Sequence, residues 1–110
     1  MRVAALALAA LLLGTSSRAA VADTYGMPVP RGTRQLEGDR YSSGRGLRDT
    51  VELYRKELAR RGVGHRRIGP YRVRGVDVTR FLLDDGEVAA IHVYRVGGKT
   101  LISFVKRARS

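Results

Sequence analysis

The residues with the widest chemical range lie near the end of the chain, where His92 and Ser103 sit in two apolar runs separated by Gly97-Gly98. A Gly-Gly pair supplies the positive φ angles of a two-residue hairpin turn, so the runs are predicted to pair with His92 opposite Ser103. A histidine next to a serine hydroxyl is the beginning of a base–nucleophile pair, to which Asp77 would add the acid. Half-exposed sheet faces also carry such polar pairs without any catalysis. Hydrolase chemistry at His92 and Ser103 is therefore the alternative, and an ordinary polar pair is the leading interpretation.

Residue patterns typical of metal or cofactor sites are weaker than the His92 and Ser103 pair. The histidines are His65 and His92 and the chain has no cysteine, whereas a zinc site needs three or four ligands. Asp84-Asp85 and Glu87 resemble a fragment of a calcium loop but lack its spacing, so they are predicted to form a turn. The glycines do not follow a phosphate-binding pattern. We expect no metal and no cofactor.

The most basic part of the chain runs from residue 60 to residue 74, with no acid between Glu57 and Asp77. Its cationic residues are Arg60, Arg61, Arg66, Arg67, Arg72 and Arg74. These arginines are predicted to converge and bind an anion, either an anionic envelope lipid or an acidic protein. Nucleic acid is a poorer match, because the segment offers only Tyr71 for base stacking. The formal net charge of +11 also fits a solvated surface in an arginine-rich composition.

A helix over 47–61 is predicted to organise the domain, because Leu47, Val51, Tyr54 and Leu58 recur at helical spacing and Gly62 follows as a stop. The i,i+4 ion pairs expected on its surface are Glu52–Lys56 and Glu57–Arg61. A helix with one apolar face needs a sheet to cover.

Strands are predicted on both sides of this helix. A short hairpin is expected over 33–36 and 40–43, a loop over 62–70, and one strand over 71–83 with a bulge at Arg74-Gly75, where the apolar residues change parity. Two registers are open for the turn at 84–87. A two-residue loop places Leu82 opposite Ala89, and a three-residue loop places Phe81 there.

The final hairpin is predicted to have two different faces. Ile91, Val93, Ile102 and Phe104 form the bulkier face, which we assign to the helix. The second face carries Val88, Tyr94, Leu101 and Val105 beside His92 and Ser103, and it is too apolar to be wholly wet. A homodimer, a partner subunit or residues 23–36 would each cover it. The element order predicts an α+β domain: a single helix on an antiparallel sheet of three to five strands, with a C-terminal β-meander.

Residues 1–22 are predicted to be a signal peptide, and residues 23–110 a single small domain. Arg2 precedes the apolar run 3–13, which is too short to span a membrane, and Ala20-Val21-Ala22 offers small residues to a signal peptidase. A retained N-terminal anchor is the alternative. The chain is thus expected to be exported to the periplasm or the cell exterior, with no transmembrane span after processing.

The Pro28-x-Pro30-x-Gly32 lead-in, the Val51-x-x-Tyr54-Arg55-x-x-Leu58 helix and the Ile91–Tyr94 hairpin resemble those of small uncharacterised exported proteins of Gram-negative bacteria. The resemblance implies a structural pattern and carries over no catalytic residue. The leading hypothesis is a non-catalytic envelope binding module with a basic surface. It would use the arginines, or a sheet-face contact made by His92, Tyr94, Leu101 and Ser103. The alternative is a small periplasmic hydrolase or ligand-binding protein with a site around His92 and Ser103.

Overall fold

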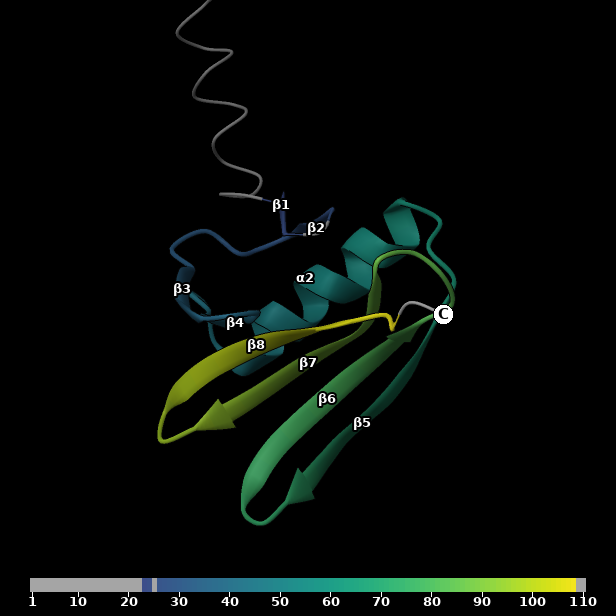
Figure 1. Cartoon of the computed structure of the whole chain (residues 1–110). Helices are drawn as coiled ribbons and strands as arrows, with labels where there is room; N and C mark the ends of the chain where they lie inside the picture. Colours follow the sequence, from purple (N-terminus) through teal and green to yellow (C-terminus); the bar gives the residue numbers. More distant parts are fainter. Residues whose placement is uncertain (1–22, 25, 109–110) are drawn as a thin grey trace, which may run out of the picture.

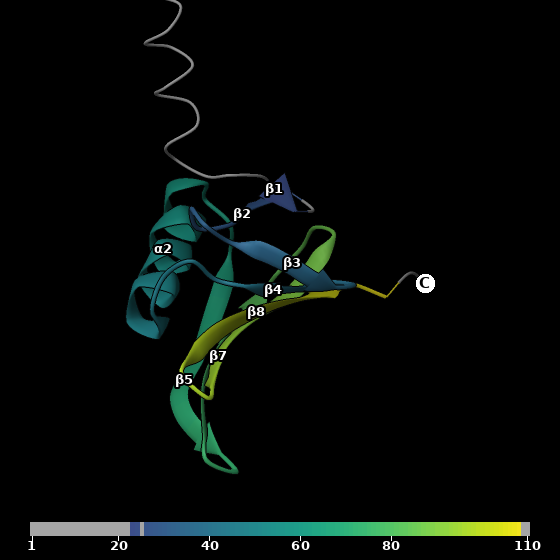
Figure 2. The same ribbon diagram turned by 90° about the vertical axis from the view of Figure 1, so that its left-hand side faces the viewer.

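A helix and a six-stranded antiparallel sheet form the two layers of this protein, whose computed structural model describes residues 23–24 and 26–108 (Figures 1 and 2). The elements are β1 (Asp23–Thr24), β2 (Met27–Pro28), β3 (Arg34–Glu37), β4 (Arg40–Ser42), α2 (Leu47–Arg60), β5 (His65–Val73), β6 (Val76–Leu83), β7 (Val88–Val96) and β8 (Lys99–Lys106). The predicted α+β class and C-terminal meander are confirmed, but the sheet has one strand more than the expected maximum of five. The predicted signal peptide, residues 1–22, lies outside the described residues.

The sheet order is β3-β4-β8-β7-β6-β5, so β3 and β5 are its edges. A separate pair, β1 and β2, lies beside the helix (Figure 1). The hairpins β5–β6 and β7–β8 extend past the end of α2, and Figure 2 shows the helix on one side of the sheet only. The opposite side of β4–β8 is called the uncovered face below.

Helix α2 follows the predicted pattern closely. Val51, Tyr54 and Leu58 are buried on its sheet-facing side. The hydroxyl of Thr50, also fully buried, donates to the carbonyl of Gly46 at 2.8 Å and lies 2.8 Å from the hydroxyl of Ser43. These bonds hold the first turn of the helix against the segment that leaves β4.

The core lies between α2 and the sheet face that the sequence assigned to it. Ile91, Val93 and Ile102 are completely buried, and Phe104 is nearly so. The ring of Phe104 meets that of Tyr54 edge-on with centroids 6.2 Å apart, a favoured aromatic geometry. The predicted helix-facing surface is therefore confirmed.

The final hairpin also has the predicted register. His92 pairs with Ser103, Val93 with Ile102, and Tyr94 with Leu101. Val88 departs from the prediction, because the register shifts between Val88 and Ala90. This bulge turns Val88 away from the uncovered face and into the core, where it is 2% exposed.

The region 62–83 contains the main error of the sequence prediction. Instead of a loop and one bulged strand, it forms two strands joined by a tight turn at Arg74-Gly75. Arg74 and Gly75 have φ angles of 51° and 80°, and positive φ at both central residues is the signature of a primed hairpin turn. The change of apolar parity at this point therefore marks a reversal of the chain. The irregularity within β5 lies between Ile68 and Tyr71 instead.

Both registers proposed for the turn at 84–87 are wrong. Phe81 pairs with Ile91 and Leu82 with Ala90, which leaves all four residues 84–87 in the turn. Arg107 closes it from the end of β8. Its guanidinium donates to the carbonyls of Leu83 at 2.8 Å and Gly86 at 2.9 Å. The chain is thus part of the fold up to Arg107.

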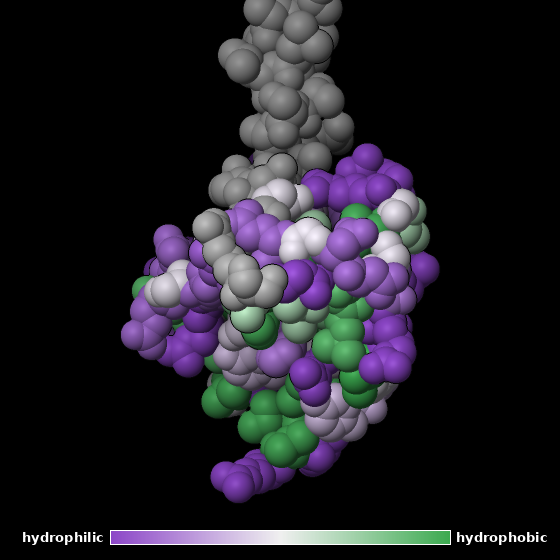
Figure 3. All heavy atoms as spheres, turned by 45° about the vertical axis from the view of Figure 1, so that its right-hand side comes forward, coloured by the Kyte–Doolittle hydropathy of each residue, from purple (hydrophilic) through white to green (hydrophobic). Residues whose placement is uncertain are grey.

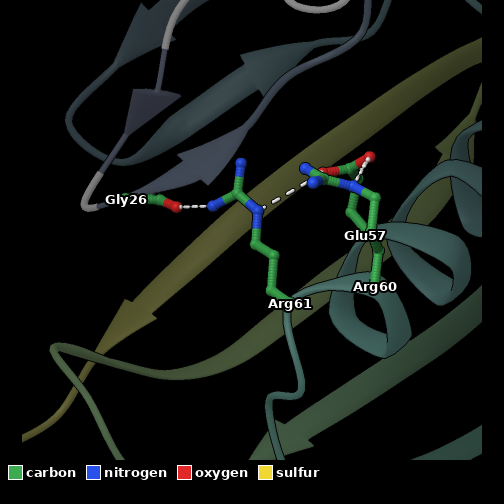
Figure 4. A network of polar contacts seen from close by, with 4 residues as sticks. All are labelled: Gly26, Glu57, Arg60 and Arg61. Carbon is green, nitrogen blue, oxygen red and sulfur yellow. Dashed lines mark hydrogen bonds and ion pairs between the residues drawn. The ribbon is translucent and has the colours of Figure 1, made fainter.

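The lead-in segment packs on the helix side of the sheet. Val29 is 3% exposed and belongs to the core that α2 covers. Arg61, which follows the helix, donates to the carbonyl of Gly26 and ties this segment to the helix end (Figure 4). The predicted hairpin is confirmed as β3 and β4 at the edge of the sheet. One alternative was that residues 23–36 cover the second face of the sheet. Val29 contradicts it, because this residue of the segment is buried in the core on the helix side.

The ion pairs on α2 agree with the prediction in one case. Glu57 pairs with Arg61 at 3.3 Å, as expected, and also with Arg60 (Figure 4). Glu52 pairs with Arg55 at 3.0 Å, so the expected partner Lys56 is replaced by a residue one position closer. The guanidinium of Arg55 reaches both carboxylate oxygens of Glu52.

Candidate functional site

The uncovered face combines an apolar stripe with a polar row. Two successive cross-strand rows form the stripe. In the first, Tyr71 pairs with Val78, Val78 with Tyr94, and Tyr94 with Leu101; in the second, Val73 pairs with Val76, and Val96 follows on β7. The stripe is defined as Tyr71, Val73, Val76, Val78, Tyr94, Val96 and Leu101. It lies near the Arg74-Gly75 and Gly97-Gly98 turns, in the part of the hairpins that extends past α2.

Several apolar side chains of this face are open to solvent. Val73 and Val96 are each 46% exposed, and Val105, beyond the polar row, is 40% exposed. Figure 3 shows hydrophobic residues in several patches on one view of the surface, with hydrophilic residues between and around them. Contiguous exposed apolar residues with a polar border are typical of an interaction surface.

The polar row is defined as Arg80, His92, Ser103 and Arg40, which are cross-strand neighbours beside the stripe. It contains both residues that suggested catalysis. Nε of Arg80 donates to Nε2 of His92 at 3.2 Å, and the hydroxyls of Tyr94 and Ser103 are 3.0 Å apart. Burial, and then the charge of Arg80, lower the pKa of His92. His92 and Ser103 are cross-strand neighbours, as predicted, but each is bonded to another side chain.

This arrangement does not assemble the predicted base–nucleophile pair. Nε2 of His92 accepts from Arg80, and Asp77 lies on the opposite side of the sheet, bound to Arg72 and Arg95 at 3.0 and 3.1 Å. A cavity of about 390 Å³ lies between α2 and β5, lined by Leu47, Arg48, Val51, Glu52, Arg67, Pro70 and Thr79. It is not beside His92. The hydrolase alternative remains a prediction without support from this geometry.

Cations border the stripe on two sides. Arg80 and Arg40 stand in the polar row. Arg40 pairs with Ser103 in the backbone ladder, and its guanidinium is ion-paired with Glu37. Lys99 and Arg74 lie at the other border, at the two distal turns, and both are exposed. Asp77 is the only acid in β5–β8, strands that the structure describes completely, and it faces the helix side. The uncovered face of these four strands therefore carries positive charge alone.

The six arginines of residues 60–74 do not converge at one point. Arg60 and Arg61 lie at the end of α2 with Glu57, while Arg66 and Arg67 alternate between the two faces of β5. Arg72 is bound to Asp77 on the helix side, and Arg74 occupies the distal turn. The placement of Arg66, Arg67 and Arg72 on the edge strand β5 has a structural explanation, because charged side chains on an edge discourage pairing with another sheet. Of the six, Arg74 borders the stripe.

The site residues absent from the sequence prediction are mainly Arg80, Val76 and Val96. Arg80 was already placed in a strand, but its neighbour His92 depends on the length of the turn at 84–87. Val76 was assigned to the same bulged strand as Tyr71 and Val73, so no pairing between Val76 and these residues was expected. The signal that could have located it is Arg74-Gly75 itself, because a glycine in the second position permits a primed turn.

Comparison of the chain with models of protein families, with curated proteins and with solved structures gave no match. Among the described residues, no helix is long and apolar enough to cross a membrane. The functional argument therefore depends on the geometry of the uncovered face.

Proposed function

We propose that this chain is a non-catalytic binding module, exported as residues 1–22 predict, which engages an anionic partner through the uncovered face of its sheet. The observation that carries the proposal is the composition of this face. An apolar stripe with exposed valines is bordered by Arg80, Lys99 and Arg74, and β5–β8 present no acid there.

Energetics support a binding role for the stripe. A patch of this kind is on the order of a few hundred Å². Removing it from water would gain roughly 5–10 kcal/mol at about 25 cal/mol/Å², before the costs of association are subtracted. The bordering cations would attract a negatively charged partner and repel a positively charged one. His92 and Ser103 support a non-catalytic role, since each is held by a neighbouring side chain.

Titration with anilinonaphthalene sulfonate, an apolar anion, tests the proposal. The full chain is expected to increase the fluorescence of the dye, with weaker binding at high salt because the border charges are then screened. The variant Val96→Asp should weaken binding about tenfold, which corresponds to 1.4 kcal/mol.

The matched control is Leu36→Asp. Leu36 is 45% exposed, against 46% for Val96, but it lies on the edge strand β3 outside the stripe. Leu36→Asp should leave dye binding unchanged. Equal binding by Val96→Asp and the wild type would place the dye elsewhere and refute the proposal for this face.

A further inference from the structure

The stripe has the footprint of a short α-helix. Its first row crosses the four strands β5–β8, about 15 Å at the usual strand spacing. Its second row, about 7 Å away, ends at Val96, because Lys99 holds the β8 position. About ten residues of α-helix have the same length of 15 Å. Figure 2 shows the long strands bowed along their length, with the hollow side turned away from α2. The axis of this bend therefore runs across the strands, in the direction of the stripe, and the hollow below means this concave face of the sheet.

Cations lie around the stripe. Arg80 lies at its border toward the base of the sheet, Arg74 at the distal turn of β5–β6, and Lys99 at the β8 end of the second row, opposite Val96. A body that lies in the hollow would thus meet valine and tyrosine side chains along its middle and guanidinium or ammonium groups on either side. An amphipathic helix has this layout when acidic residues border its apolar face.

We infer that the occupant of the stripe is an amphipathic α-helix of a partner protein, apolar along one face and acidic at both borders of that face. The inference rests on the proposed function, because it names the occupant of the same surface. The partner helix would lie across β5–β8, with its apolar residues against Val76, Val78 and Val96. Its carboxylates would reach Arg80 on one side and Lys99 on the other.

A second copy of this chain fits the stripe less well. Stable dimers bury about 800 Å² on each partner, more than a patch of a few hundred Å² provides. Two stripes in contact would also bring like charges together, and the chain has a formal net charge of +11. A lipid surface is also a poorer match, because a bilayer is flat at this scale whereas the stripe lies in a hollow.

The test uses the full 110-residue chain and a synthetic peptide. The peptide has about 14 residues, with leucines at i, i+3, i+4 and i+7 and glutamates on both sides of them. A control peptide carries lysine in place of every glutamate. The acidic peptide is expected to bind one to one and to gain helical circular dichroism on binding. Raising the salt concentration should weaken the complex, and the lysine peptide should show at least tenfold lower affinity.

Variants locate the peptide on the protein. Val96→Asp and the double variant Arg74→Glu, Lys99→Glu should each reduce affinity about tenfold or more. Leu36→Asp and Lys56→Glu are the matched controls, since Leu36 and Lys56 are exposed on β3 and on α2, away from the stripe. Both controls should bind as the wild type does. A loss of affinity in the controls equal to that in the stripe variants would overturn the inference.

Further outcomes would also overturn the inference, and the first two identify a different occupant. Binding to phosphatidylglycerol vesicles, with no binding of the peptide, would make the face a lipid-binding surface. A dimer in light scattering that Val96→Asp converts to a monomer would assign the face to a second copy. If the dye binds the stripe but neither peptide does, the proposed function survives and the helical partner is excluded; if the dye also fails to bind, the proposed function fails.

Discussion

Arg80 on β6 donates a hydrogen bond from Nε to Nε2 of His92 on β7, at 3.2 Å. The histidine therefore accepts a hydrogen bond from a permanently charged group. Burial, together with the charge of Arg80, holds the pKa of His92 below its usual value of 6.5. Nε2 can accept only when it carries no proton, so the folded state selects the neutral imidazole.

Acid is expected to weaken the fold through this pair. Unfolded His92 takes up its proton near pH 6.5, whereas folded His92 does so only at lower pH, so the unfolded chain binds more protons between the two pKa values. The contribution of His92 to the free energy of unfolding is thus complete above about pH 6.5 and is lost as the pH falls through the lowered pKa of the folded state. Urea denaturation at several pH values should show a steeper loss for the wild type than for His92→Gln. Parallel curves would contradict the prediction.

Arg107 is expected to stabilise the turn at 84–87. Its guanidinium donates to the carbonyls of Leu83 and Gly86, so Arg107→Ala should lower the free energy of unfolding by about 1–2 kcal/mol. Hydrogen exchange of residues 84–88 should accelerate in the same variant. Arg107→Lys keeps the charge but lacks the planar fork, so it should fall between alanine and wild type. A lysine variant as stable as the wild type would show that charge alone is responsible.

Arg61 should matter more than Arg60 for the N-terminal segment. Both pair with Glu57, but Arg61 also donates to the carbonyl of Gly26 (Figure 4). Arg61→Ala is therefore expected to increase hydrogen exchange at residues 26–30, while Arg60→Ala, the matched control, should leave exchange there unchanged. Exposed ion pairs contribute little, so the stability of both variants should remain within about 1 kcal/mol of the wild type. Equal exchange in the two variants would refute the role assigned to the Gly26 contact.

Arg74 offers a way to separate stability from binding. It has a φ angle of 51° in a turn that favours Asn-Gly, so Arg74→Asn should stabilise the fold by up to about 1 kcal/mol. The same change removes a cation from the border of the stripe, so the affinity for the acidic peptide should fall severalfold. Denaturation and peptide titration on one variant measure both effects. A variant that gains stability and keeps full affinity would exclude Arg74 from the binding surface.

The sequence predicts the centre of the fold well because strong local signals coincide there. β-branched residues flank Gly97-Gly98, and the apolar positions of 47–58 have helical spacing, so both elements and their facing surfaces are confirmed. The register of this hairpin also placed His92 opposite Ser103. Turn length and strand alternation together fix such pairs without any knowledge of distant strands.

The errors arise where a turn lacks its usual residues. Arginine has no preference for positive φ, so Arg74-Gly75 was interpreted as a bulge and β5 was missed. The turn between β6 and β7 is four residues long, 84–87, although Asp85-Gly86 alone could form a two-residue turn. These two turns determine which side chains surround His92, and the interaction with Arg80 therefore could not be predicted. The apolar stripe could not be predicted from the sequence for the same reason, because four of its seven residues lie on β5 and β6.

The hairpins β5–β6 and β7–β8 extend beyond α2, and the stripe lies on this extension (Figure 1). The base of each hairpin lies in the core, at Phe81 on β6 and Ile91 on β7, and the far end carries the valines of the stripe. Because β6 and β7 stay paired as far as Asp77 and Arg95, the two far ends form one sheet almost to their turns. None of the stripe residues belongs to the core cluster, so a substitution in the stripe changes the receiving surface and leaves the packing that holds the domain together in place.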